Sequence, residues 1–244
     1  MNLKSLLAAV GITVAVAAFA EVESSTTLCR IAVSTGVKST IIALPLQTVG
    51  QTEGRTIAPT KVVMPDGLPA NTKLLHWNSV KAGWDAWKIA NGAWEVEETM
   101  PSGDPLDALP CGSAAWLELP DNPTSTQTFY LYGQYFSTGA SVSAVANAST
   151  LMGACEAINV GAIKNKLHSG TSIAAGDKIV VVDPSNTVTG RKEFTYNAEL
   201  ANFAVQVYDK NQNPRRYWQT ADFTLEAGKG FLYVSNGGSP TFDW

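Results

Sequence analysis

The stretch WDAWKIANGAWEV, Trp84 to Val96, contains three tryptophans and one Asn-Gly dipeptide. Asn-Gly is the preferred centre of a two-residue type I′ hairpin turn, because both central residues take a positive φ. We therefore expect a β-hairpin that turns at Asn91 and Gly92. Its cross-strand pairs would be Ala90 with Ala93, Ile89 with Trp94, Lys88 with Glu95, and Trp87 with Val96.

The two faces of this hairpin differ in polarity. Side chains alternate between faces along a strand, so one face carries Trp87, Ile89, Trp94 and Val96. The opposite face carries Lys88, Ala90, Ala93 and Glu95. An apolar face backed by a polar one is typical of a sheet that covers a core. We expect Trp87 and Trp94 to be buried.

Four segments of the first half of the chain recur in the same order in the second half, which indicates an internal duplication. The pairs are LPANTKLLHW (68–77) with IAAGDKIVVV (173–182), AWEV (93–96) with AVQV (204–207), LPCGSAAWLE (109–118) with LEAGKGFLYV (225–234), and TFYL (128–131) with TFDW (241–244). The spacing between partners drifts from 105 to 116 residues, as loops of different length would produce. The segment IIALPLQ (41–47) has only a vague counterpart in AINVGAI (157–163).

Each copy consists of short apolar runs separated by clusters of Gly, Pro, Asn and Asp, a pattern typical of β-sandwiches and barrels. The sequence thus predicts an all-β fold with two tandem, duplicated β-sandwich-like modules. The first would occupy residues 21–138 and the second residues 139–244, with the junction in the Ser- and Ala-rich stretch 137–150.

The first twenty residues have the layout of a secretory signal. Lys4 forms a short basic region, Leu6 to Phe19 an apolar run, and the AFA at 18–20 a small-residue cleavage site. The apolar run, roughly fifteen residues long, is shorter than the about twenty that span a bilayer. We expect residues 1–20 to be a bacterial signal peptide, with an uncleaved anchor as the alternative. The protein would be secreted or held at the bacterial cell surface, with no transmembrane segment in the mature chain.

The net charge of the chain argues against two classes of binding partner. Removal of residues 1–20, which contain only Lys4 among charged residues, leaves 16 Lys and Arg against 21 Asp and Glu, a net charge of −5. This balance argues against nucleic acid and anionic lipid, because both require a basic patch.

The three cysteines, Cys29, Cys111 and Cys155, allow one disulfide and a free thiol, an intermolecular bridge, or three thiols.

No catalytic constellation is evident in the sequence. A serine or cysteine nucleophile needs a base, and the two histidines lie in a predicted strand (His76) and a predicted loop (His168). Glycoside hydrolysis uses a pair of carboxylates, and the densest acidic segments are EVEE (95–98) and DPLD (104–107). DKNQN, which begins at Asp209, matches the start of a calcium loop but lacks its glycine and its final glutamate. We expect no enzyme activity, no cofactor and no metal, with a weak calcium site at Asp209 left open.

Two functions then compete. The first is a self-assembling structural subunit of a fibre, surface layer or matrix, in which residues 21–33 dock on a neighbouring copy. The contacts between subunits would include Cys29, Ile31 and Val33, which lie in the last part of this segment.

The alternative is a carbohydrate-binding or adhesion module. Trp84 has the parity of the polar hairpin face, and Trp77 stands where the second copy has the aliphatic Val182. We expect any tryptophan exposed to a polysaccharide to be Trp84 or Trp77. Trp116, by contrast, aligns with Leu232 and is expected in the core.

Overall fold

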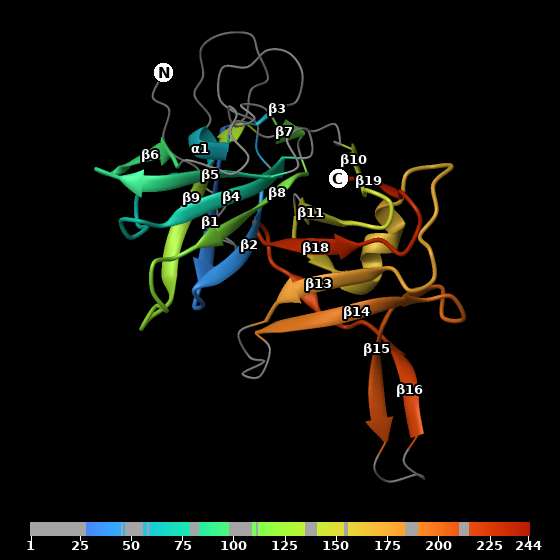
Figure 1. Cartoon of the computed structure of the whole chain (residues 1–244). Helices are drawn as coiled ribbons and strands as arrows, with labels where there is room; N and C mark the ends of the chain where they lie inside the picture. The colour runs from blue at the N-terminus through green and yellow to red at the C-terminus, as the bar shows by residue number, and fades with distance from the viewer. Residues whose placement is uncertain are drawn as a thin grey trace, which may run out of the picture.

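The computed structural model describes residues 28–44, 46, 56–57, 59–78, 83–97, 109–110, 112–134, 141–153, 156–183, 190–209 and 215–244. Antiparallel strands dominate this part of the chain, with two short helical segments (Figure 1). The predicted all-β class is therefore confirmed. The predicted signal peptide, residues 1–20, and the start of the mature chain, residues 21–27, lie outside the described residues.

The first half of the chain builds a five-stranded antiparallel sheet in the order β2-β8-β4-β5-β6. Its strands are β2 (Ser39–Ala43), β8 (Ala114–Glu118), β4 (Lys73–Asn78), β5 (Gly83–Ala90) and β6 (Ala93–Val96). Two strand pairs and one helical turn complete this half: β1 (Leu28–Thr35) with β9 (Gln127–Gln134), β3 (Thr56–Ile57) with β7 (Leu109–Pro110), and α1 (Pro59–Val62).

The second half builds a six-stranded sheet in the order β11-β18-β13-β14-β15-β16. Its strands are β11 (Ser149–Gly153), β18 (Gly230–Val234), β13 (Lys178–Val182), β14 (Arg191–Asn197), β15 (Asn202–Asp209) and β16 (Arg215–Thr220). Beside it lie β10 (Ser141–Ser143) with β19 (Thr241–Asp243), β12 (Ile158–Asn159) with β17 (Thr224–Leu225), and the 3-10 helix η1 (Val160–Lys166).

Neighbouring positions in the two sheets are filled by strands that come from corresponding places along the two halves of the chain. Positions two to five of each sheet are filled by β8, β4, β5 and β6 in the first half and by β18, β13, β14 and β15 in the second. The edge strand β2 has the place of β11, so the weak pairing of residues 41–47 with 157–163 is not supported by the strand order. Among the described residues, the first sheet has no strand equivalent to β16, and the hairpin that β16 forms with β15 extends away from the rest of the molecule (Figure 1).

The hairpin predicted from Asn-Gly has the predicted register. β5 pairs with β6 through Trp87–Val96, Lys88–Glu95, Ile89–Trp94 and Ala90–Ala93. Asn91 and Gly92 both have positive φ, 52° and 76°, as a type I′ turn requires. The expected burial of Trp87 is confirmed, and Trp94 is half-buried with its Nε1 donating to the carbonyl oxygen of Val63 at 2.7 Å.

One residue of the apolar face departs from the expectation. Val96 is 62 % exposed, although it has the parity of Trp94. It closes β6, which is the edge strand of the sheet. The first core includes Trp87 and reaches Trp94, but Val96 lies outside it. Alternation assigns a side chain to a face, whereas burial also requires a second layer above that face.

Each half has its own apolar core. The first core joins the five-stranded sheet to β1 and β9 through Cys29, Ile31, Val33, Phe129 and Leu131. The second core joins the six-stranded sheet to β10, β19 and η1 and is rich in aromatic side chains. A third, smaller cluster lies between the halves, where Ile41 and Ala114 meet Leu151, with Trp116 and Leu232 packed against them.

Backbone contacts between the halves are reciprocal. The N–H of Ala43 donates to the carbonyl oxygen of Gly228 at 2.9 Å, and the N–H of Gly153 donates to that of Gly112 at 2.8 Å. Ala43 and Gly153 end β2 and β11, which have the same place in their sheets, and the two glycines precede β8 and β18. Each half thus gives the other the contact that it receives, as in an isologous dimer.

Candidate functional site

A cleft of about 720 Å³ lies where the two halves meet. The first half contributes Trp77, Trp84 and Trp116 to its walls, and the second half contributes Val142, Val145 and Leu151. Its volume falls within the range of about 300–1,000 Å³ that is usual for ligand pockets. The cleft depends on both halves, because neither half supplies more than one of its walls.

The three tryptophans share the face of the first sheet that points away from the first core. Leu74, Leu117 and Trp87 point into that core from β4, β8 and β5. Trp77, Trp116 and Trp84 are each an odd number of residues away from them on the same strands, so they face the opposite side. Three adjacent strands therefore present one indole each to the cleft.

Trp77 and Trp84 are the exposed members of this set. They are paired in register across β4 and β5, and 42 % and 41 % of their surfaces are accessible. Their rings meet edge to face, with centroids 5.6 Å apart and an interplanar angle of 76°. This is a favourable aromatic geometry, and it leaves part of each ring open to a ligand. The sequence predicts that any tryptophan exposed to a polysaccharide is one of these two.

Trp116 differs from the sequence-based expectation in its surroundings. It is half-buried and packs against the cluster between the halves instead of lying inside one core. Its partner in the alignment, Leu232, belongs to the same cluster. The two aligned positions thus pack against the same cluster between the halves. The alignment predicts that Trp116 and Leu232 are equivalent, but it does not predict that both lie at the junction of the halves.

The wall from the second half combines apolar side chains with hydroxyl groups. Val145 is exposed beside Leu151 and Val142. The Thr150 Oγ1 accepts a hydrogen bond from the N–H of Val145 at 3.0 Å, and the Ser143 Oγ lies 2.8 Å from the Thr241 Oγ1. These hydroxyl groups line the cleft and retain capacity for further hydrogen bonds.

No Asp, Glu, Lys or Arg is among the described residues that line the cleft. Its titratable group is His76, whose Nδ1 lies 3.2 Å from the carbonyl oxygen of Ala114. Burial lowers the pKa of His76, and the hydrogen bond to Ala114 and the charge of Asp85 offset only part of that effect. The imidazole is therefore neutral at neutral pH, and the described residues that line the cleft carry no charge.

The residues expected at an inter-subunit contact are placed elsewhere. Cys29, Ile31 and Val33 point into the first core from β1, which pairs along its whole length with β9 of the same chain. Their side chains are thus buried in the folded chain, and an inter-subunit contact through them would require β1 to leave β9. This internal pairing accounts for the alternation of buried and exposed residues along β1.

None of the remaining candidates from the sequence is among the described residues that line the cleft. The His168 Nδ1 lies 2.9 Å from the Asp243 Oδ2 on the surface. Of the two acidic spots, Glu98 and residues 104–107 lie outside the described residues, as do the loop 210–214 and the Asp209 side chain of the possible calcium site. Among residues that the structure describes, no cluster of three His, Cys, Asp or Glu could hold a metal ion. The same part of the chain has no helix of the length and apolarity needed to cross a membrane.

Comparisons with protein-family models, with curated proteins and with solved structures each gave no match to this chain.

Proposed function

We propose that this chain is a secreted, non-catalytic carbohydrate-binding protein that attaches to a polysaccharide at a bacterial surface or in its surroundings. The observation that carries the proposal is the tryptophan cleft, in which Trp77, Trp84 and Trp116 line one wall. Exposed apolar surface of this kind marks ligand grooves in monomeric proteins. Secretion itself is inferred from the signal-like residues 1–20.

The chemistry of the cleft suits a neutral sugar chain. The C–H faces of a pyranose ring are apolar and can lie on an indole ring, while its hydroxyl groups need donors and acceptors at the edges. Ser143 and Thr150 supply hydroxyl groups opposite the tryptophans. Because no charged side chain from the described residues lines the cleft, we expect neutral glycans to bind better than uronates or sulfated glycans.

The proposal includes a duplicated architecture, in which each half is one β-sandwich-like module. It is supported by the shared strand order of the two sheets and by the reciprocal contacts Ala43–Gly228 and Gly153–Gly112. A duplicated pair of modules creates a junction whose two sides can diverge. The cleft is then a product of that junction and not of either module.

Affinity electrophoresis of the mature protein against a panel of neutral and acidic polysaccharides tests the function. We expect retardation on at least one neutral glycan and an affinity about tenfold lower for Trp84→Ala, equivalent to about 1.4 kcal/mol. Trp218→Ala is the matched control, because Trp218 is an exposed tryptophan of β16 that does not line the cleft. The proposal is wrong if no glycan retards the protein, or if the two variants behave alike.

A self-assembling structural subunit remains a second candidate, because of the edge strand β16. This strand lies at the edge of the six-stranded sheet and exposes the side chains of Tyr217 and Trp218. An edge strand can add a strand from another copy through its backbone groups. Assembly through residues 21–33 would instead require β1 to leave β9, which would expose the first core.

Light scattering at high protein concentration and electron microscopy test the assembly. If β16 mediates it, the wild type should form filaments or sheets, and Trp218→Glu should remain monomeric. A wild type that stays monomeric under these conditions excludes this second candidate and leaves the glycan-binding proposal untouched.

A further inference from the structure

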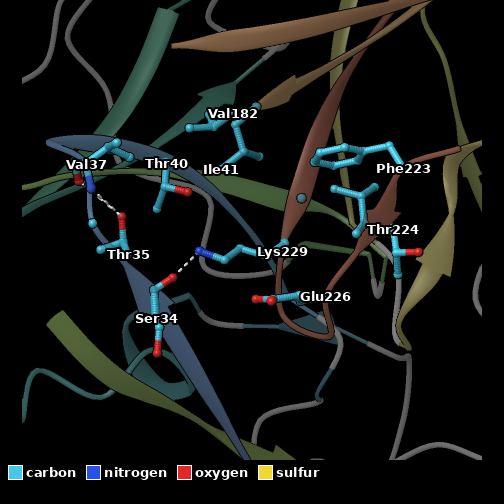
Figure 2. A pocket seen from close by; sticks show the side chains of 13 residues that line it. Ser34, Thr35, Val37, Thr40, Ile41, Val182, Phe223, Thr224, Glu226 and Lys229 are labelled. Carbon is cyan, nitrogen blue, oxygen red and sulfur yellow. Dashed lines mark hydrogen bonds between the residues drawn. The ribbon is translucent and has the colours of Figure 1, made fainter. Parts of the chain in front are cut away.

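A second cavity, of about 350 Å³, also lies between the two halves. Figure 2 shows its lining, to which the first half contributes Thr40 and Ile41 of β2 and the second half contributes Val182, Phe223 and Lys229. The cavity is smaller than the tryptophan cleft but lies within the usual size range of small-molecule sites.

The two cavities are built from equivalent positions. Thr40 and Ile41 occupy in β2 the places of Thr150 and Leu151 in β11, as the pairings Ile41–Trp116 and Leu151–Leu232 show. Lys229 precedes β18 as Ser113 precedes β8, and the bridges Ile42–Lys229 and Ser113–Met152 are reciprocal. Thr40, Ile41 and Lys229 line this cavity, and their counterparts Thr150, Leu151 and Ser113 line the tryptophan cleft. The junction therefore holds two related sites with different chemistry.

The difference lies in two charged residues, Lys229 and Glu226, and in the loss of the indoles. Lys229 replaces the small hydroxyl side chain of Ser113, and Val182 has the place of Trp77. The lining includes the apolar side chains of Phe223, Ile41 and Val182. It also contains the hydroxyl groups of Ser34, Thr35, Thr40 and Thr224 and the carboxylate of Glu226. Figure 2 shows the Lys229 side chain directed toward Ser34. A site with one cation, one exposed carboxylate and a partly apolar lining selects a different ligand from a tryptophan-lined cleft whose described lining has no Asp, Glu, Lys or Arg.

The Lys229 amine has one partner among the described residues. Its Nζ donates to the carbonyl oxygen of Ser34. An ammonium group carries three donors, so two remain for a ligand. Burial lowers the pKa of Lys229, and the charge of Glu226 opposes that shift. An anion beside the amine would offset the desolvation of its charged form.

We propose that this cavity binds a small organic monoanion with an apolar tail, such as a monocarboxylate. The carboxylate would accept hydrogen bonds from the Lys229 Nζ, and the tail would lie against Phe223, Ile41 and Val182. Charge-assisted hydrogen bonds of this type are the strong ones in proteins. Glu226, the other charged residue of the lining, is exposed and would repel a second carboxylate. A dicarboxylate of the same length should therefore bind more weakly. The site is independent of glycan binding.

Isothermal titration calorimetry of the intact mature protein with hexanoate at neutral pH and low salt tests this site. Lys229→Met, which keeps an unbranched apolar side chain and removes the charge, should weaken binding about tenfold or more. Hexylammonium, with the same tail and the opposite charge, should not bind. Lys178→Met is the matched control, since Lys178 is a surface lysine of β13 outside the cavity. It should bind hexanoate like the wild type.

The side-chain signals of Lys229 give a second measurement on the wild type, which covers the case in which Lys229→Met does not fold. Hexanoate should shift the Lys229 Cε and Nζ resonances and raise the pKa at which they titrate. The proposal is overturned if hexanoate leaves these resonances unchanged. It is also overturned if hexanoate binds Lys229→Met as well as the wild type, or if hexylammonium competes. Loss of glycan binding in Trp84→Ala with unchanged hexanoate binding would separate this site from the tryptophan cleft.

Discussion

The indole rings of Trp77 and Trp84 meet edge to face across β4 and β5, with centroids 5.6 Å apart. Both rings are partly open to solvent on the outer face of the first sheet. Trp87, three residues after Trp84 on the same strand, points the other way and is 6 % exposed. An odd spacing along a strand sends side chains to opposite faces. The strand β5 thus supplies both a core residue, Trp87, and a residue that lines the cleft, Trp84.

This division predicts different costs for two tryptophan truncations. Trp87→Ala removes a large side chain from the first core and should lower the free energy of unfolding by about 3–5 kcal/mol. Trp84→Ala, at a partly exposed site, should cost about 1 kcal/mol or less. Urea denaturation followed by circular dichroism measures both. Equal losses would contradict the assignment of Trp84 to a binding surface.

Two glycines with similar backbone conformations predict a second contrast. Gly92 has φ +76° and Gly228 has φ +80°, so alanine is strained at both positions. A Cβ at Gly92 would meet no atom within 4 Å, whereas a Cβ at Gly228 would lie 2.5 Å from the Val33 Cγ2. We expect Gly92→Ala to cost about 1 kcal/mol of stability from the backbone. Gly228→Ala should lower the stability by about 1–3 kcal/mol more than Gly92→Ala, because overpacking of a filled site costs about this much.

Thermal and urea denaturation of both glycine variants provide the measurement. Because Gly228 belongs to the second half and Val33 to the first, the added cost reports on packing between the halves. If the two variants lose the same stability, the close contact between Gly228 and Val33 is wrong.

His76 predicts a loss of stability in mild acid. Burial lowers its pKa below the ordinary value of 6.5, so the unfolded chain binds a proton more readily than the folded chain. Stability should therefore fall as the pH decreases from 6.5 towards the lowered folded-state pKa. His76→Gln should remove this part of the pH dependence.

Urea denaturation at several pH values above the range where carboxylates titrate measures the effect. His168→Gln is the control, because His168 lies on the surface beside Asp243. If wild type and His76→Gln show the same slope of stability against pH, the burial assigned to His76 is wrong.

The cysteines give a prediction about covalent chemistry. Within the described residues Cys29 is a free thiol, and burial raises its pKa. Only Cys111 and Cys155, which lie outside the described residues, then remain for an intramolecular disulfide. We expect alkylation to spare Cys29 in the folded protein and to label it after unfolding. Peptide mapping by mass spectrometry would show this, and rapid labelling of Cys29 in the folded protein would contradict it.

Much of the first sheet could be predicted from local sequence. Asn91 and Gly92 specify the turn, because few other residues accept positive φ at both positions, and the turn sets the register from Trp87 to Val96. Alternation then assigned Trp87 to the core and Trp84 to the opposite face. These inferences hold because turn chemistry and strand parity act over a few residues.

Long-range pairing was beyond the reach of the same reasoning. The alternating apolar residues of β1 fit either a docking strand or a core strand, and only the folded chain shows that β9 pairs with β1. Val96 has core parity, yet it is exposed because the second layer does not cover the edge strand β6. Burial depends on what lies above a face, which strand parity does not encode.

The cleft and the Lys229 cavity were decided by the tertiary structure alone. Sequence reasoning singled out Trp77 and Trp84 but could not place Val145 or Leu151 opposite them, because those residues come from the other half of the chain. Lys229 carried no sequence signal, since a lysine in a turn is ordinary until the fold places it beside a cavity. The sequence determined which side chains each half presents. The docking of the halves through Ala43, Gly228, Gly112 and Gly153 determined which of them meet.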